Sequence, residues 1–173
     1  FAKICPGKER MLSQTLFFDA MAYCAKRMPR GAVSGELIAG VEPIRDTLRA
    51  VEFIAGLGAF PTVCVFRPTV GSDMQDWPAP QYDEMRRVLQ YVYDACRRNW
   101  IPIGAAPNIE VSIVVNPDDA ALLAPRNAGF WVYEAYRRTA RVVAAPLFSW
   151  RRRPRRRDSG VGGGTSPNRA SGV

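Results

Sequence analysis

The chain has 173 residues, of which 47% are hydrophobic, and a formal net charge of +8 at pH 7. This size and composition suit one domain with its own hydrophobic core. No apolar stretch approaches the roughly 20 residues of a membrane-spanning helix, and no N-terminal signal pattern is present, so we expect a cytoplasmic protein without a membrane partner. Seven arginines and one aspartate in residues 151–173 account for six of the eight charges, which leaves +2 for residues 1–150. The folded part is therefore close to neutral.

Residues 8–27 predict a helix, because apolar side chains recur there at helical spacing until Pro29 and Gly31. The short apolar run 33–39 predicts a first strand. Residues 43–56 predict a second helix that begins at a proline and whose apolar face is formed by Leu48, Val51, Ile54 and Ala55.

The second half of the chain continues the alternation. Residues 62–66 predict a second strand, and residues 68–80 form a loop rich in proline and glycine. The clearest helix covers residues 81–99, with one face formed by Met85, Val88, Leu89, Val92 and Cys96. A third strand over 108–115 and a last helix over about 129–143 complete the pattern. We place the domain at residues 1–145 and expect residues 146–173 to be a disordered tail rich in arginine and glycine.

Alternating helices and strands predict an α/β fold with parallel strands. In the strand over 108–115 the odd positions are all apolar and most even positions are polar, so one face meets helices and the other is polar. This favours a (β/α) barrel over a sheet covered on both faces. The polar lumen would be lined by Ser34, Glu36, Thr62, Asn108, Glu110 and Ser112. Alternatively, Glu36 or Glu110 lies at a strand end in contact with water.

The available side chains exclude several kinds of chemistry. The chain has no histidine, which removes Ser-His-Asp and Cys-His catalysis and the common zinc sites. No cysteine lies within four residues of another, so the pairs that clusters and zinc sites need are missing; the four are Cys5, Cys24, Cys64 and Cys96. We interpret Cys24 and Cys96 as small hydrophobic residues on apolar helix faces.

Two segments resemble a known family. Residues 34–43, SGELIAGVEP, resemble the strand-five region of radical S-adenosylmethionine (radical SAM) enzymes, and residues 66–72, FRPTVGS, resemble their strand-six exit. The resemblance covers roughly residues 1–120, which have the overall look of radical SAM proteins distantly similar to biotin synthase. It implies that the chain is the C-terminal part of a partial barrel. It also implies an S-adenosylmethionine site formed by Ile38, Ala39, Gly40, Glu42, Phe66 and Arg67.

The chain departs from this family in one respect. Radical SAM enzymes hold a four-iron four-sulfur cluster on a CxxxCxxC loop, which this sequence lacks. We therefore expect the cluster only in a full-length protein, and a chain that begins with Phe1 rather than Met reads as an inactive fragment. In the intact enzyme the resemblance implies reductive cleavage of S-adenosylmethionine to a 5′-deoxyadenosyl radical. The small-molecule substrate is not identified, and its candidate contacts are Glu36, Asn108, Glu110 and Ser112.

The arginine run at residues 151–157 leaves a second hypothesis open. Six arginines in seven residues would contact phosphates directly. Arg67, in a different segment, could bind a carboxylate or phosphate or be an ordinary surface residue. No interleaved aromatic residues accompany the run, so we do not expect nucleic acid as the partner. The alternative function is a non-catalytic α/β protein whose basic tail binds nucleic acid or other polyanions.

Overall fold

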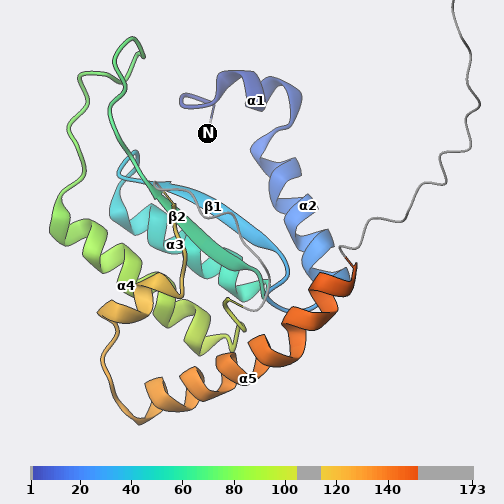
Figure 1. The fold of residues 1–173 in the computed structure, drawn as a ribbon. Helices are drawn as coiled ribbons and strands as arrows, with labels where there is room; N and C mark the ends of the chain where they lie inside the picture. The colour runs from blue at the N-terminus through green and yellow to red at the C-terminus, as the bar shows by residue number, and fades with distance from the viewer. Residues whose placement is uncertain (1, 105–113, 152–173) are drawn as a thin grey trace, which may run out of the picture.

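The computed structural model describes residues 2–104 and 114–151 (Figure 1). Its elements are α1 (Pro6–Met11), α2 (Gln14–Arg27), β1 (Ser34–Ala39), α3 (Ile44–Gly56), β2 (Phe60–Val65), α4 (Tyr82–Arg98), β3 (Val114–Val115), a short 3₁₀ helix η1 (Asp119–Leu123) and α5 (Ala128–Arg151). Three strands pair in the order β1-β2-β3. The fold is thus a mixed α/β arrangement, as the sequence predicts. The described strands form an open sheet, and the partial (β/α) barrel stays a prediction.

Strands β1 and β2 are parallel and are joined by α3, which confirms the predicted crossover. The carbonyls of Val33 and Ala39 accept hydrogen bonds from the N–H groups of Phe60 and Phe66, both at 2.9 Å. Odd residues of β1 therefore bond to even residues of β2. Pro61 lies at an odd position, so its missing N–H costs the β1–β2 ladder nothing.

The pairing of β2 with β3 corrects one prediction. Val63 pairs with Val115 and Cys64 with Val114, and the two strands run antiparallel. We expected all three strands to be parallel because helical crossovers join parallel neighbours. Here β3 runs in the opposite direction to β2, although helix α4 lies between the two strands in the sequence. Of the predicted strand 108–115, only these last two residues are described.

The buried core lies between the sheet and helices α3 and α4. On β1, Gly35 and Ala39 are buried and Ser34, Glu36 and Ile38 are exposed, so the two faces of this strand differ. The predicted apolar faces of α3 and α4 pack into this core. Their buried residues include Val51, Ile54, Ala55, Val88, Val92 and Cys96. Cys96 is fully buried, as expected of a small hydrophobic residue.

The N-terminal helices differ from the single helix predicted over 8–27. The helix breaks before Ser13, whose side-chain oxygen accepts a hydrogen bond of 3.3 Å from the Leu16 N–H and caps α2. Neither α1 nor α2 contains a buried residue. Leu16, for example, belongs to the face that periodicity predicts to be buried, but its exposed fraction is 49%.

Helix α5 is held to the core by a buried polar network. The Tyr93 hydroxyl donates to Glu134 at 2.9 Å, and Arg137 donates two hydrogen bonds to the same carboxylate at 2.6 and 2.8 Å. Burial alone would raise the pKa of Glu134, but the hydrogen bonds from Arg137 and Tyr93 outweigh it and lower that pKa. The Glu134 carboxylate therefore has its hydrogen-bond partners within the fold and acts as a structural group. A further hydrogen bond, from the Tyr133 hydroxyl to the Ile101 carbonyl at 2.5 Å, also holds α5 to the core.

Helix α5 runs to Arg151, past residue 145 where we placed the domain boundary. The rest of the predicted tail, residues 152–173, lies outside the described residues, as do the candidate substrate contacts Asn108, Glu110 and Ser112. Within the described part of the chain, no helix is both long and apolar enough to cross a bilayer.

Candidate functional site at the strand ends

The two parallel strands end at the same edge of the sheet. Ala39 pairs with Val65, so the segments that follow them, 40–42 and 66–68, leave the sheet side by side. Ligands of parallel α/β folds bind at this edge, because loops and helix N-termini converge there. This edge holds four of the six predicted cofactor contacts: Gly40, Glu42, Phe66 and Arg67.

The loop between β2 and α4 folds back over this edge. Phe66 packs edge-on against Trp77, with ring centroids 6.2 Å apart. The Lys3 ammonium lies 5.6 Å from the centre of the Trp77 ring. Pro80, near the end of the loop, lies directly against Gly40. The strand ends are therefore partly covered by the chain itself.

Position 40 requires glycine for two reasons, its backbone conformation and its contact with Pro80. Its φ is +97°, a conformation that residues with a side chain rarely adopt. A Cβ atom built on Gly40 would lie 2.8 Å from the Pro80 Cβ and closer still to its Cγ. The family resemblance implies that this glycine contacts S-adenosylmethionine. In the structure, the neighbour that comes close to Gly40 is Pro80.

Glu42 lies just before α3, where the positive end of the helix dipole favours a carboxylate. The hydroxyl of the buried Thr47 donates to Glu42 Oε1 at 3.5 Å. The Thr47 N–H bonds to the Pro43 carbonyl at 3.4 Å. The rest of the Glu42 side chain is exposed. Thr47 therefore orients the Glu42 carboxylate from one side, and the exposed side is accessible to a hydroxyl donor.

The remaining predicted contacts divide between the two faces of the sheet. The Ala39 side chain is fully buried in the core, so only its backbone can meet a ligand. Ile38 is 45% exposed on the opposite face, together with Glu36. Thr62 pairs with Glu36 but is 4% exposed, and its hydroxyl donates to the Gly35 carbonyl at 3.5 Å. Of the predicted polar lining on these two strands, only Ser34 and Glu36 are open.

Cys64 is on the same face as Glu36 and Ile38. Burial raises the pKa of its thiol, the Glu36 carboxylate raises it further, and Arg67 acts in the opposite direction. Such a thiol stays protonated at neutral pH and is a poor nucleophile or metal ligand. We therefore assign it no chemical role.

A four-iron four-sulfur cluster does not fit the described residues. All four cysteines are free thiols on separate elements or loops. Among residues 2–104 and 114–151, no three His, Cys, Asp or Glu side chains are placed to share a metal ion. Three thiolates of one loop hold the cluster in radical SAM enzymes, and this donor set is missing here.

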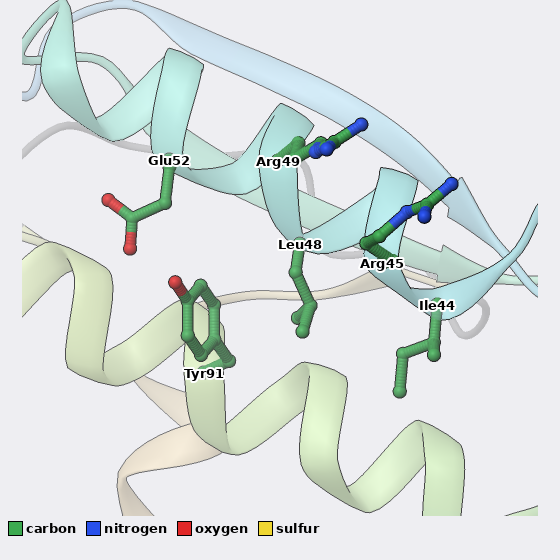
Figure 2. Close-up of a pocket in the computed structure, with 6 residues that line it drawn as sticks. All are labelled: Ile44, Arg45, Leu48, Arg49, Glu52 and Tyr91. Carbon is green, nitrogen blue, oxygen red and sulfur yellow. The ribbon is translucent and has the colours of Figure 1, made fainter.

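A groove between α3 and α4, which the sequence analysis did not anticipate, lies on the helical side of the molecule (Figure 2). Ile44, Leu48 and Tyr91 form its apolar wall, and Glu52 forms an ion pair with Arg98 at one end. A hydrogen bond from Tyr91 to Glu52, together with burial, raises the pKa of the tyrosine. Arg45 and Arg49 also border the groove, but in Figure 2 they point away from α4. Periodicity places Leu48 on an apolar helix face but gives no sign of the groove.

Comparison with known proteins gives one relevant similarity. No family model matches the chain, and no solved structure matches it. Over 95 residues the chain is 28% identical to the bacteriochlorophyllide c C-7(1)-hydroxylase of Chlorobaculum limnaeum. The match covers 54% of this chain and 24% of the hydroxylase. The hydroxylase is a radical SAM enzyme, so the match supports a relationship to that superfamily; similarity to biotin synthase is not shown.

Proposed function

We propose that the chain is the C-terminal part of a radical SAM catalytic domain, and that residues 40–42 and 66–68 form one wall of its S-adenosylmethionine pocket. The observation that carries the proposal is the 95-residue similarity to a radical SAM hydroxylase. The parallel β1–α3–β2 unit supports it, since its strand ends bring together the segments that resemble the family.

In this proposal S-adenosylmethionine, held by residues 40–42 and 66–68, would supply the radical chemistry when bound. The residues of this chain bind and orient. Glu42, to which Thr47 donates a hydrogen bond, would accept a hydrogen bond from a ribose hydroxyl of the cofactor. Phe66 and Trp77 give an apolar boundary that keeps water from the strand ends, and Arg67 places a cation beside it. The identity of the substrate does not follow from these residues.

Because the described residues do not provide three thiolates, the proposal places the cluster ligands on another part of a longer polypeptide. The chain alone would then bind the nucleoside portion of the cofactor weakly, and it would not cleave it. S-Adenosylhomocysteine is the suitable probe, because it carries the same adenosine and needs no reductant.

The test is a calorimetric titration of S-adenosylhomocysteine into the wild-type chain and into Glu42→Gln. Loss of a hydrogen bond to a charged group costs about 1.5–3 kcal/mol, so the variant should bind roughly 10- to 100-fold more weakly. Glu84→Gln, the same change at an exposed position in the first turn of α4, is the matched control and should bind like the wild type.

Two outcomes would contradict the proposal: no binding by the wild-type chain at millimolar ligand, or equal binding by wild type and Glu42→Gln. A truncation after Trp150 removes the arginine run and should leave the affinity unchanged. If the truncation alone abolishes binding, the ligand is held as a polyanion by the tail, and the alternative function is favoured.

A further inference from the structure

The outward face of α5 carries a row of exposed apolar side chains. Trp131 and Val142 are separated by about three helical turns, as are Val132 and Val143, so each pair lies along one line of the helix. The exposed fractions are 52% and 75% for the first pair and 58% and 65% for the second. In Figure 1, α5 runs along the lower margin of the molecule, and no other labelled element lies below it. We call these four residues, together with the exposed Ala135 between them, the α5 stripe.

The opposite face of α5 fixes this orientation. Phe130 and Tyr133 are 5% and 1% exposed, and their ring centroids lie 5.9 and 5.6 Å from that of Tyr93 in α4. The Tyr136 hydroxyl donates a hydrogen bond to the Trp100 carbonyl at 3.1 Å. The α5 stripe therefore points outward because the core packs against the other face of the helix.

The positive charge of the protein is concentrated on the same segment of the chain. Residues 126–157 contain ten arginines and one acid, Glu134, so they carry a net charge of +9 and the rest of the chain carries −1. Glu134 is 5% exposed and is bonded to Arg137. The α5 helix therefore presents no exposed carboxylate beside its apolar stripe. Such an uneven charge distribution favours association with an anionic surface.

Three arginines border the α5 stripe. The Arg126 guanidinium lies 6.0 Å from the centre of the Trp131 ring. Arg138 and Arg141 are exposed, and the helical repeat places both on one side of the line from Trp131 to Val142. The outward face of α5 thus combines an apolar surface with a cationic border.

Charge and side-chain type together select the occupant of this face. A second copy of the chain would bring the same arginines together without an exposed carboxylate of α5 to neutralise them. Nucleic acid would meet the arginines but would leave the valines unused, because bases stack on aromatic rings. An anionic lipid surface suits both features, since tryptophan and aliphatic side chains enter the headgroup region while arginines contact the phosphates.

We infer that α5 binds flat on an anionic lipid bilayer, with the α5 stripe inserted among the headgroups and Arg126, Arg138 and Arg141 at the phosphates. The arginine run at 151–157, which follows α5 in the sequence, adds to the attraction. We expected no membrane partner because no apolar stretch is long enough to span a bilayer, but a helix that lies at the lipid surface needs only one apolar face.

The probes are two kinds of sucrose-loaded vesicle, one of phosphatidylcholine and one of an equimolar mixture of phosphatidylcholine and phosphatidylserine. The full chain is sedimented with each, and the bound fraction is measured against lipid concentration. We expect binding to the anionic vesicles and little to the neutral ones, with an affinity that falls as salt is added, because salt screens the charges. No S-adenosylmethionine analogue is present, so a failure here is distinct from a failure of the calorimetric titration.

The cationic border is tested by the double variant Arg138→Gln, Arg141→Gln. Each cation near an anionic surface contributes about fivefold to the affinity, so the variant should bind the anionic vesicles roughly 25-fold more weakly. The matched control is Arg86→Gln, Arg87→Gln, which makes the same charge change at exposed positions of α4 and should bind like the wild type.

The apolar stripe is tested by the double variant Val142→Gln, Val143→Gln, which leaves the charge unchanged. Loss of two inserted aliphatic side chains should weaken binding to the anionic vesicles at least about tenfold. Val70→Gln is the matched control, because Val70 is 93% exposed in the β2–α4 loop, away from α5. Circular dichroism checks that each variant keeps the fold, as expected for exposed positions.

The inference is overturned if the wild-type chain does not sediment with the anionic vesicles. It is also overturned if the valine variant binds them as tightly as the wild type, since the arginines would then act alone as a polycation. A labelled oligothymidylate is titrated in parallel, and valine substitutions that weaken its binding but not vesicle binding would assign the stripe to nucleic acid instead. A wild-type dimer that the valine variant abolishes would show that a second copy covers the stripe, and would likewise overturn the inference.

Discussion

Replacing Gly40 with alanine tests how tightly the β2–α4 loop is seated on the strand ends. The new Cβ must adopt a φ of +97° and must enter space that the Pro80 ring fills. A residue with a side chain in a left-handed conformation costs about 1–2 kcal/mol, and overpacking costs about 1–3 kcal/mol. Gly40→Ala should therefore destabilise the chain by about 2–5 kcal/mol, measured by equilibrium urea unfolding followed by circular dichroism.

The two contributions can be separated with a double-mutant cycle. Pro80→Gly removes the ring and leaves the backbone of Gly40 unchanged. In that background the alanine should cost only the backbone contribution, about 1–2 kcal/mol, so the coupling between the two sites should be about 1–3 kcal/mol. Equal costs of Gly40→Ala in both backgrounds would refute the contact with Pro80 as the reason for the glycine.

This result determines which variants can report on ligand binding. A bulky residue at Gly40 would disturb the fold whether or not a cofactor approaches the turn. Lost binding in such a variant would not identify a cofactor wall. Glu42 is the better probe, because its carboxylate is exposed and Glu42→Gln keeps its size and its contact with Thr47.

Two further predictions concern the core and the cysteines. Glu134 has a lowered pKa in the folded state, so its contribution to stability is present above the unfolded value of about 4.3 and is lost as pH falls through the folded value. Glu134→Gln should thus cost about 3–5 kcal/mol at pH 7 and progressively less towards pH 3 in urea unfolding, whereas a constant difference would contradict the assignment. Anaerobic reconstitution with iron and sulfide should yield no stoichiometric four-iron four-sulfur cluster, and a spectrum corresponding to one cluster per chain would show that these cysteines can come together.

The local elements could be predicted from the sequence because their signals are local. The apolar spacing of Val51, Ile54 and Ala55 identifies the buried face of α3, and alternation identifies the exposed face of β1. The same spacing assigns Leu16 to a buried face of the N-terminal helix, where it is about half exposed. Periodicity shows which residues share a face, but it does not show whether another element covers that face.

The contacts that define the site join residues far apart in the chain. Alternation in the strand over 108–115 predicts two unlike faces but carries no information on direction, so the antiparallel pairing of β3 could not be read from it. Likewise, the sequence shows Gly40 only as part of a strand-to-helix turn, where a ligand can come close to the backbone. Its contact with Pro80 could not be predicted, because Pro80 is distant in the sequence.

The two faces of β1 show the same separation between local signals and packing. Odd residues of β1 face β2 and the core, so their identity is explained by packing: Gly35 makes room for Met21 and Ile54, and Ala39 is buried. Even residues direct their backbone groups outward and expose their side chains, and packing within the described chain does not account for a carboxylate at Glu36. Glu42 at the strand ends is likewise exposed, so Glu42→Gln tests the proposed site without disturbing the packed face of β1.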